Sequence, residues 1–186
     1  MKINFSHALE EHQKAIQSVL AQQSIVEQTV AEIIQAVATG NKVIWLGNGG
    51  SAADAQHMAA ELMVRYVKDR QPIASLALTT DSSILTAHSN DYEFDTVFSR
   101  QIEGIAKAGD VVIAMSTSGN SVNVVKAVEA AKQLGCITVA LTGAKTSALS
   151  AMADYCLQIN SVETARIQEA HSFFSHLLCE GLDSVY

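Results

Sequence analysis

The sequence predicts an α/β fold: a three-layer, doubly wound sandwich in which helices cover both faces of a five-stranded parallel sheet, with a long helix at the N-terminus. Two observations predict it. Short apolar segments alternate with longer segments of helical period along the 186 residues, as in chains built from strand–helix–strand units. The apolar segments are hydrophobic at consecutive positions, most clearly from Val111 to Met115. Such runs are typical of parallel strands buried on both faces.

The first 40 residues are predicted to be helical. Apolar residues recur at helical spacing from about Ser6 to Val37, and Gly40 ends the pattern. The spacing fits one long helix or two helices joined near Gln23. Hydrophobic residues make up 48% and charged residues only 17% of the chain, which leaves apolar helix surface for another subunit. We therefore expect residues 1–40 to be an oligomerisation segment and residues 41–186 to be the sandwich, within a single domain over residues 1–186.

Strands and helices alternate beyond Gly40. Five strands are expected at Lys42–Leu46, Ala74–Leu78, Asp110–Met115, Cys136–Leu141 and Tyr155–Ile159. Helices are expected from Ser51 to Val64, from about Ser82, from about Thr96 to Ala108, from Val122 to Leu134 and from about Glu163 to Leu182. Right-handed crossovers between the parallel strands then place helices on both faces of the sheet.

The charge and composition exclude several classes of protein. The net charge is −7 and no Lys or Arg cluster occurs, so direct binding of a nucleic-acid backbone is not expected. No apolar run resembles a signal peptide or a membrane span, which predicts a cytoplasmic protein without membrane contact. Cys136, Cys156 and Cys179 are odd in number and far apart, so they are expected to be reduced.

Two polar loops follow strands directly and open helices: Gly47–Ser51 and Ser116–Ser121. Both therefore lie at the carboxyl edge of the sheet, where doubly wound folds bind ligands. Hydroxyl groups and backbone N–H donors at a helix N-terminus bind a phosphate dianion without Lys or Arg. The simpler alternative is that the serines cap a helix and the glycines make a turn. The occurrence of two such loops favours a phosphate site, and neither loop matches the nucleotide-binding spacings.

The paired loops, together with three further motifs, resemble a known family. The further motifs are Asp54-Ala55-Gln56-His57-Met58-Ala59-Ala60-Glu61-Leu62, Asn90-Asp91, and Ala165-Arg166-Ile167-Gln168-Glu169 with His176 beyond it. These residues resemble the SIS (sugar isomerase) domain family and, more closely, the bacterial phosphoheptose isomerases. The resemblance covers nearly the whole chain, and it implies the flavodoxin-like strand order of that family.

The resemblance also implies the chemistry of the site. Glu61 would be the general base that forms an enediol and His176 the partner acid, and His57, Glu61, Gln168 and His176 would match the family's zinc ligands, with one zinc per active site. Substrate contacts would come from Asn48, Gly49, Gly50, Ser51, Glu61, Asn90, Asp91, Ser116, Thr117, Ser118, Ser121 and Gln168. The spacing itself adds that His57 and Glu61, four residues apart, share one helix face.

Spacing leaves parts of this assignment open. Gln168 and His176 are eight residues apart, about 12 Å along a straight helix, so a shared ion requires the side chains to lean together or to come from different subunits. His171, three residues from Gln168, competes on spacing alone. A zinc-bound carboxylate is a weaker base, which leaves the metal either structural or exchanging ligands during turnover. Ala165 stands where some relatives carry Asp, which puts the identity of the sugar in doubt.

The expected function is that of an aldose–ketose isomerase. The resemblance implies that it interconverts D-sedoheptulose 7-phosphate and D-glycero-D-manno-heptose 7-phosphate, supplies heptose for lipopolysaccharide, and forms a homotetramer. The alternative is a non-catalytic SIS protein, either a scaffold that associates with the DnaA replication initiator or a sensor of sugar phosphates. The presence of His57, Glu61, Gln168 and His176 together favours the enzyme, because a scaffold has no need of this set.

Overall fold

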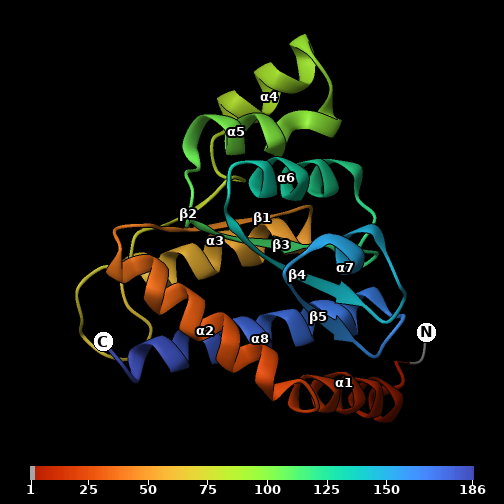
Figure 1. Ribbon diagram of the computed structural model, residues 1–186. Coiled ribbons are helices and arrows are strands. Elements are labelled where there is room, and N and C mark those ends of the chain that lie inside the picture. The colour runs from red at the N-terminus through yellow and green to blue at the C-terminus, as the bar shows by residue number, and fades with distance from the viewer. Residues whose placement is uncertain (1–2) are drawn as a thin grey trace.

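The computed structural model describes residues 3–186, and its centre is a sheet of five parallel strands (Figure 1). The strands are β1 (Val43–Gly47), β2 (Ser75–Ala77), β3 (Val111–Met115), β4 (Ile137–Gly143) and β5 (Tyr155–Ile159). Their order across the sheet is β2-β1-β3-β4-β5. The strand order reverses between β1 and β3, which places the switch point of the doubly wound fold between these two strands. The predicted fold class is confirmed.

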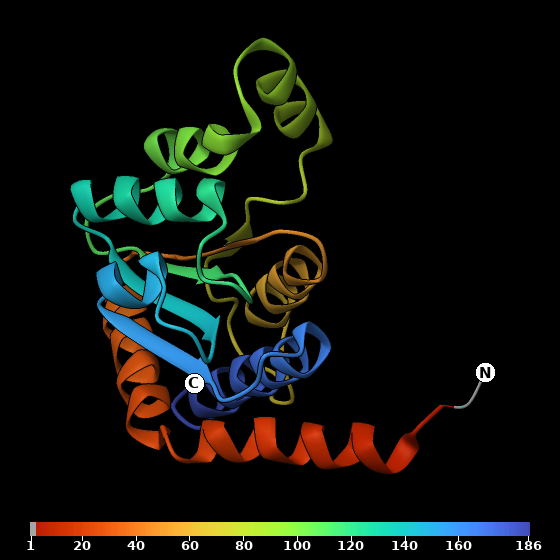
Figure 2. The same cartoon turned by 90° about the vertical axis from the view of Figure 1, so that its right-hand side faces the viewer.

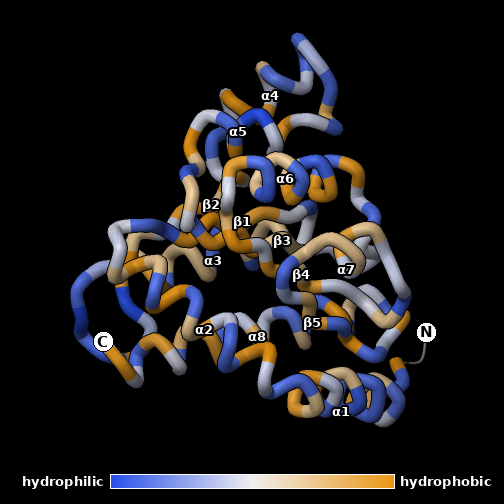
Figure 3. Tube along the Cα trace, in the orientation of Figure 1, coloured by the Kyte–Doolittle hydropathy of each residue, from blue (hydrophilic) through white to orange (hydrophobic). Residues whose placement is uncertain are grey.

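Helices cover both faces of the sheet (Figure 1). They are α1 (Phe5–Leu20), α2 (Gln23–Ala38), α3 (Gly50–Met63), α4 (Ser82–Asp91), the 3₁₀ turn η1 (Phe94–Thr96), α5 (Val97–Ile105), α6 (Val122–Gln133), α7 (Ala148–Met152) and α8 (Thr164–Asp183). One apolar core joins α1, α2, α3 and α8 to the sheet, and a second joins α5, α6 and α7 to its other face. The tube coloured by hydropathy follows these layers, since its central strands are mostly hydrophobic (Figure 3).

The N-terminal segment consists of two helices, the second of the two arrangements that the spacing allowed. Gln22 holds the junction: its side-chain amide donates to the carbonyls of Ser18 and Gln158, and its Oε1 accepts from Gln158 N. The junction is therefore pinned to β5, and α1 turns away from α2 to lie along α8. The N-terminal part of α1 projects beyond the rest of the chain (Figure 2).

Three elements differ from the expected ones by more than one residue at an end. The short helix α7 was not predicted, and it is begun by a capping box in which Ser147 and Ser150 each bond the other's backbone N–H. β4 continues two residues beyond its predicted end, to Gly143. The helix expected up to Ala108 ends at Ile105, since Asp110 draws Lys107 N into a hydrogen bond of 2.9 Å outside the helix. No helix within residues 3–186 has the length and apolarity needed to cross a membrane.

Candidate active site

The glycine loop and the serine loop lie side by side at the carboxyl edge of the sheet. They follow β1 and β3, which are neighbours and pair Gly47 with Met115. A Cβ at Gly47 would lie 2.7 Å from Ser51 Cβ and 2.9 Å from Met115 O. Glycine is therefore required at position 47 for the first turn of α3 to approach the end of β3. This approach brings Ser51 beside the start of the serine loop, as the sequence predicted for two loops at one edge.

The hydroxyl groups of the serine loop converge. Ser116 Oγ lies 3.0 Å from Ser121 Oγ and 3.3 Å from Ser118 Oγ. Ser121 is the N-cap of α6 but makes no side-chain capping bond, because its hydroxyl faces Ser116 instead. The helix-cap alternative therefore does not describe Ser121. Gly119 has a φ of +67°, and a Cβ there would overlap Ser147 Oγ, so only glycine allows the loop to pack against the start of α7.

The electrostatics of this edge favour an anion. α3 and α6 both begin here, and their N-terminal N–H groups and dipoles carry partial positive charge. Neither Gly47–Ser51 nor Ser116–Ser121 contains a Lys or Arg. A dianion at this place would be held by backbone donors and serine hydroxyls.

Asn48 and Gln168 both lie at the glycine loop, but they have different partners. The amides of Asn48 and Asn123 exchange two hydrogen bonds of 2.9 Å each, so Asn48 ties the glycine loop to α6. Gln168, on α8, lies against the glycine loop, because a Cβ at Gly50 would meet its Nε2 at 2.6 Å. The Gln168 amide is thus placed at the predicted phosphate site.

Three predicted metal ligands meet where α3 and α8 lie side by side: His57 and Glu61 on α3 and His176 on α8. We call them the His–Glu–His cluster. One ligand atom from each lies within 4.8 Å of the others. His57 Nε2 is 3.0 Å from Glu61 Oε1, and the rings of His57 and His176 are 5.2 Å apart between centroids. Two imidazoles and a carboxylate, with room for a further ligand, form a donor set that suits a catalytic zinc ion. The cluster fits the expected metal by its chemistry.

α3 and α8 run parallel, and a hydrogen bond joins them between the Gly50–Gln168 contact and the His–Glu–His cluster. The hydroxyl of Ser172 donates to Asp54 Oδ1 at 3.0 Å. Burial raises the pKa of the Asp54 carboxyl, against the opposing effects of the Ser172 hydrogen bond and of His57 and His176. Asp54 was not singled out from the sequence, although its position three residues before His57 places both on one helix face.

Within one chain, the His–Glu–His cluster and the predicted phosphate site lie apart. Ser51 and Glu61 are ten residues apart on α3, about 15 Å along a straight helix. Gln168 lies against Gly50, about 12 Å before His176 along a straight α8, whereas the other three predicted metal ligands meet in the cluster. Asn90 and Asp91 end α4, which projects from the body (Figure 1). The Asn90 amide donates to Asp91 Oδ1 at 2.8 Å. The roles predicted for these residues stay predictions.

His171 lies in the core and not in the cluster. Its side chain is fully buried, and Nε2 lies 3.2 Å from Thr142 O at the end of β4. Burial lowers the pKa of its imidazole to about 4, although the bond to Thr142 opposes this. Its Nδ1 and the neighbouring Ser175 Oγ have no hydrogen-bond partner. His176, and not His171, therefore lies with His57 and Glu61, and the role expected of His176 stays a prediction.

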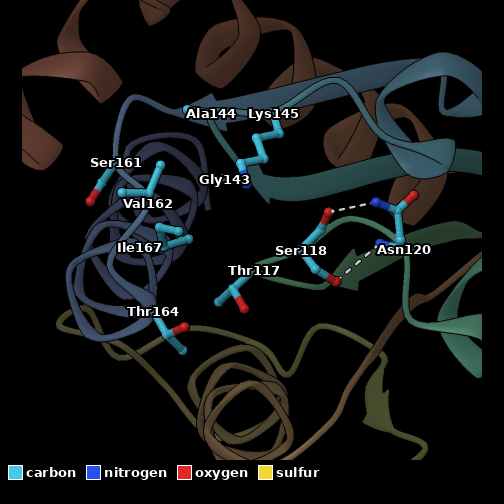
Figure 4. A pocket seen from close by; sticks show the side chains of 10 residues that line it. All are labelled: Thr117, Ser118, Asn120, Gly143, Ala144, Lys145, Ser161, Val162, Thr164 and Ile167. Carbon is cyan, nitrogen blue, oxygen red and sulfur yellow. Dashed lines mark hydrogen bonds between the residues drawn. The ribbon is translucent and has the colours of Figure 1, made fainter.

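A pocket of about 340 Å³ opens beside the serine loop (Figure 4). It is lined by Thr117, Ser118, Asn120, Gly143, Ala144, Lys145, Ser161, Val162, Thr164 and Ile167. Lys145 was missed by the sequence reasoning, because it stands alone in the loop after β4 and no motif marks it. Glu61 and His176 are not among the lining residues, in agreement with the separation described above.

Comparison with known proteins identifies the family. The SIS domain model matches residues 5–143. The phosphoheptose isomerase of Campylobacter concisus is 46% identical over 100% of this chain and 98% of its own length. That of Aquifex aeolicus is 48% identical over 89% of each chain. The structure of the phosphoheptose isomerase from Neisseria gonorrhoeae has a TM-score of 0.90 at 40% identity and covers 97% of this chain and 96% of that chain.

More distant relatives share the fold alone. The NanR protein of Vibrio vulnificus, solved with ManNAc-6P, is 17% identical with a TM-score of 0.70 over 97% of this chain and 62% of that chain. The high identity and full coverage of the nearer relatives, together with the loops and the cluster, lead to one conclusion: the chain belongs to the SIS domain family and, within it, to the phosphoheptose isomerases.

Proposed function

We propose that this isomerase interconverts D-sedoheptulose 7-phosphate and D-glycero-D-manno-heptose 7-phosphate. The observation that carries the proposal is the pairing of two features that share α3: an anion site at the starts of α3 and α6, whose two loops contain no Lys or Arg, and a carboxylate–imidazole cluster on α3 and α8. The first suits a sugar phosphate and the second suits proton transfer. The relatives named as phosphoheptose isomerases support the seven-carbon substrate.

In the proposed mechanism, the phosphate is held by Ser51, Ser116, Ser118 and Ser121 and by the N–H groups that begin α3 and α6. Thr117, Gly49, Gly50 and Gln168 lie beside this seat and would contact the sugar. Asn48, bonded to Asn123, keeps the two loops in register. Because the phosphate is remote from the reacting carbons, its binding energy serves to position them.

Glu61 would carry out the proton transfer. Its carboxylate removes the proton from the carbon beside the carbonyl, and the C–H electron pair forms the double bond of an enediol. His176 protonates the carbonyl oxygen in this step. Glu61 then returns its proton to the neighbouring carbon while His176 takes a proton from the other hydroxyl, so that the carbonyl is moved by one carbon.

Zinc would be held by the His–Glu–His cluster, with Gln168 as the fourth expected ligand. When bound, the ion would polarise the substrate oxygens as a Lewis acid. His57 contributes an imidazole on the helix turn next to Glu61, so the two side chains are directed to one point by local geometry alone. Half of the His57 side chain and a fifth of the Glu61 side chain are accessible, at 48% and 22%, which leaves the cluster open to a ligand.

Assembly of several copies would complete the site. The separation of Ser51 and Glu61, about 15 Å along α3, and the position of Gln168 eight residues from His176 are reconciled if a second copy brings its own residues across. We propose a homotetramer in which residues 1–40 oligomerise and in which Asn90 and Asp91 on the projecting α4 reach a neighbouring site. Exposed apolar side chains on α1, among them Phe5 and Leu9, support such a contact.

In the cell, this activity would supply heptose for lipopolysaccharide in the cytoplasm, without a nucleic-acid or membrane partner. The DnaA-associated scaffold is the weaker alternative, because a scaffold gains nothing from His57, Glu61 and His176 meeting. For the alternative of a sugar-phosphate sensor, the similar structures include the sugar isomerase domain of an RpiR transcription factor from Sphaerobacter thermophilus. That structure is only 19% identical, so its likeness extends to the fold alone.

Turnover of sedoheptulose 7-phosphate in deuterated water tests the proposal. Deuterium is expected at the carbon beside the carbonyl. Glu61→Gln is expected to lower this turnover by about 10²- to 10⁴-fold, the range for loss of a general base, while sugar-phosphate binding persists. Glu129→Gln, an exposed change on α6, is the matched control. Undiminished turnover by Glu61→Gln would contradict the assigned base, and absence of turnover by the unaltered protein would contradict the substrate.

A further inference from the structure

A buried ion pair joins the C-terminal ends of the two helices that carry the cluster. Arg70, in the segment after α3, and Asp183, the last residue of α8, are 2.9 Å apart between Nε and Oδ1. Their side chains are only 1% and 7% exposed. Burial of two charges is costly, and an apolar pair would often be at least as stable. The pair therefore invites an explanation beyond stability.

Arg70 uses its remaining N–H groups to fix the backbone at Glu61. Arg70 Nη2 donates to Glu61 O and Nη1 donates to Leu62 O, both at 3.0 Å. These carbonyls belong to the last turn of α3, where a cation is also favoured by the helix dipole. Arg70 thus holds the turn that carries the proposed base.

Asp183 fixes the segment that leaves α3. Its Oδ2 accepts hydrogen bonds from Val67 N at 2.9 Å and Lys68 N at 2.8 Å. The hydrogen bonds and the neighbouring cation together lower the pKa of this carboxyl, against the opposing effect of burial. The backbone directly after Tyr66 is therefore held in place by a charged group.

Tyr66, which this arrangement holds, lies against His176. The two ring centroids are 5.8 Å apart with an interplanar angle of 31°. The ring of His57 also lies near His176, with its centroid 5.2 Å away and an interplanar angle of 72°. The His176 ring thus has two aromatic neighbours, His57 from the cluster and Tyr66 from the segment that Asp183 and Arg70 hold.

We propose that Tyr66 is a positioning residue for His176 and that the Arg70–Asp183 pair keeps Tyr66 in place. The proposal rests on the proposed function only in assigning the proton transfer to His176. A displacement of about 1 Å at a reacting group is enough to cost about 100-fold in rate. A rigid ring beside His176 limits its rotation in a way that a flexible aliphatic side chain does not.

A second buried ion pair gives a matched control. The Asp110 carboxylate accepts a hydrogen bond from Lys42 Nζ. It also accepts hydrogen bonds from the backbone N–H groups of Lys42 and Lys107. This is the same set of partners that Asp183 has: one cation and two amides. Asp110 precedes β3 and so lies at the amino edge of the sheet, opposite the candidate site. Asp110→Asn therefore reports the cost of losing such a pair without disturbing Tyr66.

The experiment compares Asp183→Asn with Asp110→Asn, and Tyr66→Leu with Tyr66→Phe, in the full-length protein. It measures kcat and KM for sedoheptulose 7-phosphate, the urea midpoint of unfolding, and the NMR signals of the His176 ring. Asp183→Asn and Tyr66→Leu are expected to lower kcat by about 10- to 100-fold with KM changed less than about threefold. Both should shift the His176 ring signals. Tyr66→Phe should restore most of the kcat lost in Tyr66→Leu, because the ring remains.

Two outcomes would overturn the proposal. One is an equal loss of kcat in Asp183→Asn and Asp110→Asn, which would make the pair merely structural. The other is a Tyr66→Leu protein whose kcat and His176 signals match those of the unaltered protein. Failure of the proposed function is recognised separately, by absence of turnover in the unaltered protein. In that case the His176 signals alone decide whether Tyr66 positions the ring.

Discussion

The buried His171 makes the stability of the protein depend on pH, with a sign that its surroundings determine. In the folded state its pKa is lowered to about 4, chiefly by burial, whereas an unfolded chain has a histidine pKa of about 6.5. The unfolded state therefore binds more protons in the window between these values. Stability that is present at pH 7 is lost as the pH falls from about 6.5 towards 4.

The magnitude follows from the two pKa values. Between pH 7 and pH 5 the linkage relation gives a loss of about 2 kcal/mol from this one residue, and about 3 kcal/mol at still lower pH. Urea unfolding at pH 7 and pH 5, at one fixed protein concentration, measures the loss for the unaltered protein and for His171→Gln. The raised pKa of Asp54 acts in the opposite direction, but it is common to both proteins and cancels in the comparison.

The His171→Gln protein is expected to lose about 2 kcal/mol less than the unaltered protein between the two pH values. Its absolute stability at pH 7 is not the test, since glutamine changes the packing and the bond to Thr142. If both proteins lose the same free energy of unfolding between pH 7 and pH 5, then His171 is not a buried neutral group and the argument is wrong.

Two further predictions concern the glycine loop and the metal. Gly50→Ala is expected to raise KM for the sugar phosphate by displacing Gln168, whose Nε2 would lie 2.6 Å from the new Cβ. The control is Gly104→Ala, where nothing lies within 4 Å of the new Cβ. This control should leave KM unchanged and slightly raise stability. Equal KM values for the two variants would contradict this. Elemental analysis of the purified protein is expected to find about one zinc per active site, and a chelator should lower the melting temperature of the protein. A metal-free protein whose melting temperature does not respond to added zinc would refute the assignment.

Much of the fold follows from local sequence properties. Continuous apolar runs such as Val111–Met115 indicated buried parallel strands, and the loops after β1 and β3 were predicted to meet because carboxyl ends of parallel strands share one edge. His57 and Glu61 were paired correctly because four residues make about one helical turn. α7 escaped prediction because it is a single short turn begun by Ser147 and Ser150, whose capping bonds need no extended apolar pattern.

The resemblance pointed to His176 and spacing did not, and only the tertiary structure shows where the two histidines lie. His171 and His176 lie on one helix, and spacing alone favoured neither. The packing of α8 turns His171 to the end of β4, where it is buried, and turns His176 towards α3. Gln168 is likewise placed at Gly50 by helix packing and not by its motif.

The sequence by itself determined the order of the elements, the two polar loops and the His57–Glu61 pair, because each depends on the periodicity of one segment or on the direction of adjacent strands. Only the tertiary structure decided which distant side chains meet. Arg70 and Asp183, 113 residues apart, and Asn48 and Asn123, 75 apart, carry no local signal of their pairing. Their contacts arise from how whole helices pack on the sheet, and that packing is a property of the assembled core.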